Sequence, residues 1–162
     1  MRRTVLTILS LVAMSSLTAS VAFAGTGAHF FSASASVSDS GALVVSWDEA
    51  GLGSGSSVDY SLSADSTADY GCLNGGGHNP SASNKHTVSG PLLASVSGLH
   101  PKGGRIKSSL GAGPLSAGSF SCPKGQKLVL ADVTYSNIVL TDTTNNVSTN
   151  VGSVSRTFFK FK

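Results

Sequence analysis

Hydrophobic and polar residues alternate along much of this chain with a period of two. From Phe31 to Val37 the apolar positions alternate with serines at positions 32, 34 and 36. Successive side chains of a β-strand point to opposite faces, so this pattern predicts a strand with one apolar and one hydroxyl-rich face.

The same alternation recurs in segments that are separated by residues typical of turns. We expect strands at residues 31–37, 43–47, 58–64, 70–72, 86–99, 105–110, 120–122, 127–143 and 154–161. Gly90-Pro91 is expected to interrupt the strand at 86–99, because proline cannot donate a hydrogen bond to a neighbouring strand. The pattern predicts eight or nine short strands and no helix after the N-terminal segment.

The apolar parity changes within the longest predicted strand segment, residues 127–143. Ile138 and Leu140 are even-numbered, whereas the preceding apolar set is odd-numbered: Val129, Ala131, Val133 and Tyr135. A parity shift of this kind predicts a bulge or a bend near Ser136-Asn137.

Many short strands joined by frequent turns predict an all-β fold, an antiparallel β-sandwich. Trp47 and the two cysteines, Cys72 and Cys122, further indicate an immunoglobulin-like core. Their order is Trp, Cys, Cys, however, and antibody domains have Cys, Trp, Cys. A small β-barrel is the alternative architecture.

The first 24 residues have the organisation of a cleavable secretory signal. Arg2 and Arg3 precede an uncharged apolar stretch, and the small-residue run Ala22-Phe23-Ala24 follows it. Cleavage after Ala24 would leave residues 25–162 as a single secreted, extracellular domain. The apolar stretch is too short and too rich in Ser and Thr for a span of about 20 apolar residues, so we expect no stable membrane insertion.

Removing the signal changes the charge of the protein. The whole sequence has 11 Lys and Arg residues and 8 Asp and Glu residues, for a formal net charge of +3. Two of the basic residues, Arg2 and Arg3, belong to the signal, so the mature domain is close to neutral. A near-neutral domain lacks the excess of positive charge that attracts proteins to the phosphates of nucleic acid.

Cys72 and Cys122 both lie in the mature domain. An even number of cysteines in an exported chain predicts a disulfide. Tyr70 and Phe120 each precede a cysteine by two residues, so both cysteines are expected to face a shared core. Two widely separated cysteines are a poor pattern for zinc, which is usually bound by close pairs.

Residues 74–84 form the longest segment that cannot be a helix or a central strand, because they include three consecutive glycines and a proline. A disulfide at Cys72 would anchor this segment, and displayed loops often carry functional residues. It is therefore the candidate binding loop, whose first residues are Asn74, Gly75, Gly76, Gly77, His78 and Asn79. His78 and His86 flank or lie in this segment, and plain solvent exposure is favoured over a ligand role for them.

Motifs of catalysis are missing from the sequence. It contains no G-x-S-x-G, G-x-G-x-x-G, P-loop, HExxH or CxxC pattern. Glu49 is the only glutamate, so a carboxylate pair would need aspartates. The aspartates lie mostly at predicted strand edges or turns, where solvated or turn-capping side chains are ordinary: Asp48, Asp59, Asp65, Asp69, Asp132 and Asp142. We therefore expect no enzymatic activity, no cofactor and no metal.

One junction leaves a different possibility open. Cleavage after Ala28 would place His29 at the mature N-terminus. This junction resembles the start of secreted copper proteins with β-sandwich folds, the lytic polysaccharide monooxygenases and the small periplasmic copper carriers. Their further motifs are missing here, and the A-x-A rule favours Ala24.

Four segments of the chain resemble small secreted proteins of actinomycetes whose function is not known. The segments are residues 43–53, 72–77, 120–126 and 137–143. The resemblance covers most of residues 29–160. It implies a secreted single domain and supplies no catalytic residue or ligand.

The sequence thus favours a secreted, non-catalytic binding or surface-interaction domain. Its partner would be an extracellular protein or a cell-wall polysaccharide. The alternative is a protease-inhibitor-like or effector protein that displays residues 74–84 to a partner protein. A copper protein that begins at His29 is the third hypothesis.

Overall fold

The structure is a computed structural model that describes residues 27–76 and 84–161. The predicted signal peptide, and Gly77, His78 and Asn79 of the candidate loop, lie outside the described residues. The strands are β1 (His29–Val37), β2 (Leu43–Ala50), β3 (Val58–Asn74), β4 (His86–Leu99), β5 (Arg105–Ala112), β6 (Gln126–Asp142) and β7 (Val147–Thr157).

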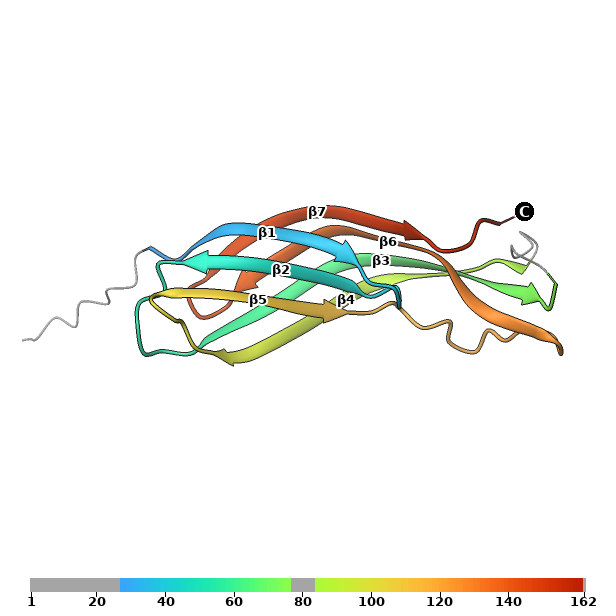
Figure 1. Cartoon of the computed structure of the whole chain (residues 1–162), viewed down its shortest axis with the longest axis horizontal. Helices are drawn as coiled ribbons and strands as arrows, with labels where there is room; N and C mark the ends of the chain where they lie inside the picture. Colours follow the sequence, from blue (N-terminus) through green and yellow to red (C-terminus); the bar gives the residue numbers. More distant parts are fainter. Residues whose placement is uncertain (1–26, 77–83, 162) are drawn as a thin grey trace, which may run out of the picture.

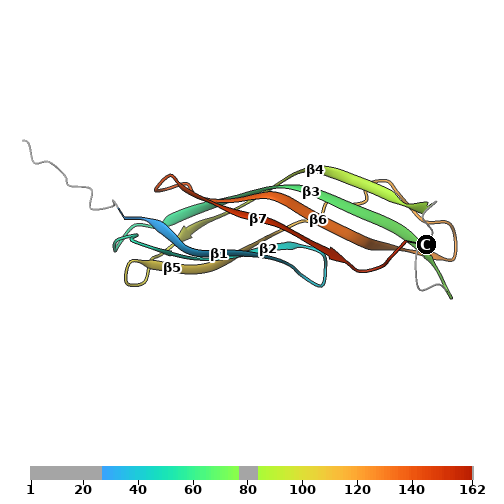
Figure 2. The ribbon, with the colours of Figure 1, turned by 90° about the horizontal axis from the view of Figure 1, so that it is seen from above.

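These strands form two antiparallel sheets that pack face to face (Figures 1 and 2). One sheet has the order β1-β2-β5, and the other has the order β4-β3-β6-β7. The predicted all-β sandwich is confirmed, and the described part of the chain contains no α-helix. Two separate sheets replace the barrel that was the alternative. The immunoglobulin-like core stays a prediction.

The strands are fewer and longer than the turn signals predict. Residues 58–64 and 70–72 belong to one strand, β3, which is 17 residues long. Gly90-Pro91 does not interrupt β4, because β4 is an edge strand and its open side needs no hydrogen-bond donor. Residues 120–122 are not a strand, and β7 begins at Val147.

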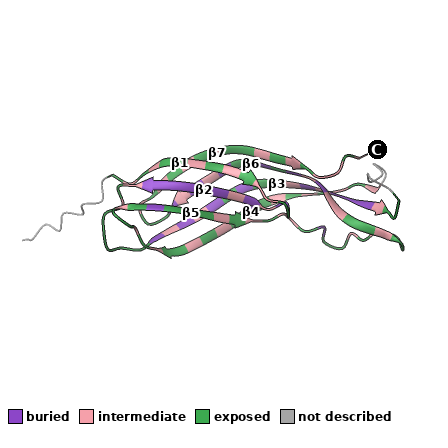
Figure 3. Cartoon of the chain, viewed as in Figure 1, coloured by how far each residue is buried: buried purple, intermediate pink, exposed green. Residues whose placement is uncertain are grey.

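The core lies between the sheets, where the inward positions of the alternating strands meet (Figure 3). Buried positions are concentrated on β2, β3 and β6, and Trp47 packs on Tyr60 with ring centroids 4.7 Å apart. All three tyrosines are buried, and the hydroxyl of Tyr135 donates to the carbonyl of Gly41 at 2.6 Å. The strands that form the core therefore also position the residues at the ends of the sandwich.

The predicted bulge in β6 is confirmed. The pairing of β6 with β7 shifts register between Tyr135 and Ile138, and Asn137 has a φ of 51°. Both Tyr135 and Ile138 are fully buried. The bulge keeps the apolar side chains directed inward although their sequence parity changes.

A second bulge, in β1, contradicts the prediction for Phe31. The pairing of β1 with β2 shifts register between Phe30 and Ser32. Phe31 therefore points outward and is 71% exposed, whereas Phe30 packs against the core, 6.4 Å from the Tyr60 ring. The predicted apolar face of this strand keeps Ala33, Ala35 and Val37 but loses Phe31.

Candidate functional site

The functional candidates lie at opposite ends of an elongated molecule. Figure 1 shows the turn from β4 to β5 at one end of the long axis, and the last residues of β3 at the other end. The loop selected from the sequence follows β3, and a cluster of charged residues surrounds the β4–β5 turn.

The predicted disulfide is present. The Sγ atoms of Cys72 and Cys122 are bonded, with 5.6 Å between the two Cα atoms. Cys72 lies near the end of β3, and Cys122 lies in the segment that connects β5 to β6. The disulfide therefore ties that connection to the strand that enters the candidate loop.

Both stems of the candidate loop are held by the sheet. Asn74 pairs with Gln126 on β6, and His86, the first residue of β4, pairs with Tyr70 on β3. The His86 ring also stacks on Phe120, with centroids 4.6 Å apart.

Asn74, Gly75 and Gly76, the described first residues of the loop, are exposed. Among the described residues, no side chains converge on these three residues to form a pocket. The loop therefore stays a prediction from the sequence.

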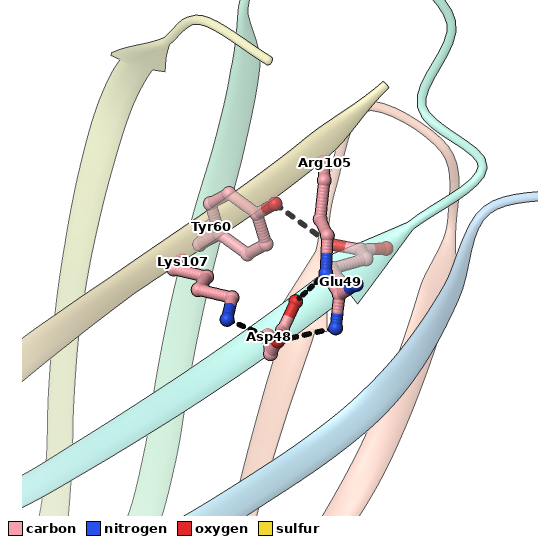
Figure 4. Close-up of polar contacts among 5 residues, drawn as sticks. All are labelled: Asp48, Glu49, Tyr60, Arg105 and Lys107. Carbon is pink, nitrogen blue, oxygen red and sulfur yellow. Dashed lines mark hydrogen bonds and ion pairs between the residues drawn. The ribbon is translucent and has the colours of Figure 1, made fainter. Parts of the chain in front are cut away.

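At the other end, Arg105 is held by Asp48 (Figure 4). The guanidinium donates from Nε to Oδ1 at 2.5 Å and from Nη2 to Oδ2 at 2.6 Å. Lys107 Nζ lies 3.3 Å from Oδ2 of the same carboxylate. These residues meet because β2 and β5 are antiparallel neighbours in which Asp48 pairs with Lys107 and Ala50 pairs with Arg105.

The expectation that Asp48 is solvated or caps a turn is wrong. Asp48 is a buried residue on a central strand, and only 8% of its surface is exposed. Its hydrogen bond with Arg105 lowers the pKa of the Asp48 carboxyl, and the same bond raises the pKa of Arg105. A bidentate pair of this kind fixes the plane of the guanidinium.

A pocket of about 360 Å³ opens beside this pair. Its wall includes the four basic side chains of His100, Lys102, Arg105 and Lys107, together with Leu99, Ile106 and Ser108. We call the four basic residues the basic end. None of the lining residues is acidic.

Phe31 adds an exposed aromatic ring to this region. The guanidinium carbon of Arg105 lies 5.0 Å from the centroid of the Phe31 ring, within the range of a cation–π contact. Arg105 thus contacts Phe31 and also lines the pocket.

The residue after Asp48 points the opposite way, into the core (Figure 4). Glu49 is fully buried, and its Oε2 accepts a hydrogen bond from the Tyr60 hydroxyl at 2.7 Å. Within residues 27–76 and 84–161, neither Glu49 Oε1 nor the buried Trp47 Nε1 has a hydrogen-bond partner. The outward Asp48 and the inward Glu49 follow from the strand alternation.

A second buried carboxylate, Asp142, lies close enough to interact with Glu49. Burial raises the pKa of Glu49 to about 7, the Tyr60 hydrogen bond opposes this shift, and the Asp142 carboxylate adds to it. Asp142 itself accepts hydrogen bonds from the backbone amides of Thr144 and Asn145, both at 2.8 Å. The prediction that aspartates cap turns is correct for Asp142, but this side chain is buried rather than solvated.

The sequence pattern alone does not single out the basic end. Asp48, Arg105 and Lys107 all have outward positions in their strands, and this parity is visible in the sequence. Their meeting depends on the pairing of β2 with β5, which the sequence pattern does not specify. Phe31 was missed because the bulge in β1 reverses its direction.

In the described part of the chain, no three His, Cys, Asp or Glu side chains are grouped so that they could hold a metal ion. His29, the residue of the copper hypothesis, is exposed at the start of β1 and hydrogen-bonds the carbonyl of Gly27. No helix among the described residues is long and apolar enough to cross a membrane.

The fold and the site define a two-sheet antiparallel sandwich with a basic pocket at one end and a disulfide-anchored loop at the other. No protein-family model, no curated protein and no solved structure matches this chain.

Proposed function

We propose that this protein is a secreted, non-catalytic binding domain that holds an extracellular partner at the basic end. The observation that carries the proposal is the Asp48–Arg105 pair at the pocket rim. Asp48 uses two guanidinium N–H groups, and the others remain to donate to a ligand. Because Arg105 is already oriented, a ligand pays little of the ordering cost that weakens binding by flexible side chains.

Secretion is supported by two features of the chain. The N-terminal segment has the parts of a cleavable signal, and the disulfide belongs to an oxidising compartment. Intact-mass measurement of the secreted protein identifies its first residue. We expect Gly25, and a protein that begins at His29 would instead favour the copper hypothesis.

The strand order supports the immunoglobulin-like subtype as part of the proposal. Constant-type immunoglobulin domains place their third, sixth and seventh strands in one sheet and their first, second and fifth in the other. This chain has the same division of these six strands, but its fourth strand, β4, lies beside β3, whereas the fourth strand of a constant-type domain lies in the other sheet.

A protein-inhibitor or effector role for residues 74–84 is the second candidate. It is favoured by the stems of the loop, which the disulfide and the β3–β6 pairing hold in place. A rigidly anchored loop can be displayed to a partner protein at lower entropic cost.

Binding assays with paired variants separate the two candidates. The secreted protein is tested against cell-wall polysaccharides and against extracellular proteins, including proteases. One variant carries Lys102→Gln and Lys107→Gln, and the other replaces residues 76–79 by a Gly-Ser linker. We expect the first variant to lose partner binding and the second to keep it.

Lys124→Gln with Lys127→Gln is the matched control, because both lysines are exposed and lie far from the basic end. It removes the same charge and should leave binding unchanged. Loss of binding only in the loop variant would support the inhibitor or effector role instead. A turnover of substrate that the secreted protein catalyses would contradict both candidates.

A further inference from the structure

The basic end brings three cationic residues, Lys102, Arg105 and Lys107, to the lining of one pocket. Elsewhere, Lys85 is paired with Asp69 and Arg156 with Asp39, and Lys124 and Lys127 are exposed near the start of β6. At the basic end, Asp48 is the single carboxylate that faces Arg105 and Lys107, and Lys102 is exposed without an acidic partner in the described chain. This excess predicts an anionic ligand.

The hydrogen-bond donors point to an oxyanion. Asp48 occupies the Nε edge of Arg105, which leaves the remaining guanidinium N–H groups free to donate, and Lys102, Arg105 and Lys107 are all among the residues that line the pocket. Guanidinium and ammonium groups bind carboxylates and phosphates through charge-assisted hydrogen bonds. The pocket volume, about 360 Å³, accommodates a small charged group together with part of the unit that carries it.

The exposed Phe31 ring points to a ligand with an apolar face beside its charge. Phe31 is 71% exposed on the other side of Arg105 and lies on a strand of the same sheet. A bare inorganic anion gains nothing from such a ring. A sugar ring has an apolar face of C–H groups that can pack on an aromatic side chain, and the outer face of β1 and β2 adds the hydroxyls of Ser32, Ser34 and Ser46.

We infer that the basic end binds an acidic polysaccharide, with a carboxylate or phosphate in the pocket and a sugar ring against Phe31. This inference rests on the proposed binding function and names the class of its ligand. Nucleic acid is disfavoured because the mature domain as a whole is close to neutral, whereas a duplex is bound along an extended basic surface.

Titration of the secreted protein with defined probes tests the inference. Oligogalacturonate carries carboxylates on sugar rings, and its methyl ester has the same rings without the charge. Phosphomannan carries phosphate on sugar, and inorganic polyphosphate carries charge without sugar. We expect binding of oligogalacturonate or phosphomannan at least about tenfold tighter than binding of the ester or of polyphosphate, and weaker binding as salt rises.

Three variants locate the site. Lys102→Gln should weaken binding of the acidic sugars about threefold. Phe31→Ala should weaken it about fivefold and leave the weak binding of polyphosphate unchanged. Lys124→Gln at the far end is the charge-matched control and should have no effect. Circular dichroism and the unfolding midpoint of each variant verify that it is folded.

The probe that binds identifies the source of the oxyanion. Preference for oligogalacturonate supports a uronate polymer, and preference for phosphomannan supports a phosphate-bearing one. Equal binding of the methyl ester, equal binding of polyphosphate, or full affinity in Phe31→Ala would overturn the inference. If a neutral polysaccharide or a protein is captured through Lys102 and Lys107, the proposed function stands and this inference fails.

Discussion

Two consecutive residues, Asp48 and Glu49, face opposite sides of one sheet and show how different surroundings act on the same chemical group. Asp48 faces outward to a guanidinium and an ammonium, which favour its charged form. Glu49 faces the core, where burial and the nearby Asp142 favour its protonated form. At the residue scale, therefore, the Asp48 carboxylate orients the Arg105 guanidinium, whereas the Glu49 carboxyl group binds a proton more tightly than an exposed glutamate does.

The raised pKa of Glu49 makes stability depend on pH. In the unfolded chain the pKa is near 4.5, and in the folded protein it is about 7, so the folded state holds the proton more tightly. The protonated Glu49 therefore contributes to the free energy of unfolding. This contribution is fully present below pH 4.5 and is lost as the pH rises to about 7. The loss amounts to about 3 kcal/mol.

Denaturant unfolding at several pH values measures this effect. We expect the free energy of unfolding to fall between pH 4.5 and 7.5, and to fall less in Glu49→Gln, which keeps an acceptor for Tyr60. The His29→Gln variant is a control for the exposed histidine near Glu49, and its free energy of unfolding should still fall over this range, because burial is the main cause of the raised pKa of Glu49. A wild-type profile that rises over this range would contradict the assignment.

At the scale of elements, the two bulges have opposite consequences. The bulge in β6 preserves the core across a change of parity, so both Tyr135 and Ile138 stay buried. The bulge in β1 exposes Phe31 and leaves Phe30 to pack against the core. The β6 bulge therefore keeps apolar side chains in the core, and the β1 bulge places an aromatic ring on the surface.

The β1 bulge predicts different effects for two adjacent phenylalanines. Phe30→Ala should lower the free energy of unfolding by about 2 kcal/mol, because it removes a ring that packs near Tyr60. Phe31→Ala should change it by less than about 0.5 kcal/mol, since the ring is largely exposed. Urea unfolding of both variants tests this. The reverse order of effects would mean that β1 follows the regular alternation without a bulge.

At the scale of the whole molecule, the two ends are built by different means. The loop end depends on a covalent link between β3 and the β5–β6 connection, whereas the basic end depends on strand pairing and one ion-pair cluster. The sandwich between them keeps these ends apart. A change at one end should therefore leave the other end intact.

The disulfide should contribute strongly to global stability. It links cysteines 50 residues apart. Closing a loop of this length lowers the conformational entropy of the unfolded chain, which raises the free energy of the unfolded state by about 4 kcal/mol. Replacing both Cys72 and Cys122 by Ala should therefore lower the free energy of unfolding by about 2–5 kcal/mol. Unfolding curves of the double variant and of the reduced wild type measure the change.

The basic end supplies the internal control for this experiment. At a temperature where the double variant is folded, ligand binding at Arg105 should equal that of the wild type. An unchanged unfolding midpoint, together with two titratable thiols in the native protein, would show that the disulfide does not form.

The sequence by itself determined the fold class, the inward side of the strand at Tyr70, the β6 bulge and the cysteine pair. Each of these follows from local alternation or from cysteine number, and both can be counted along the chain. Only the tertiary structure decided that Asp48 would meet Arg105, 57 residues away, and that Phe31 would be exposed beside it. Alternation predicts which side chains share a face. The register between strands and the place of a bulge decide which of them touch, because both depend on the packing of the whole sandwich.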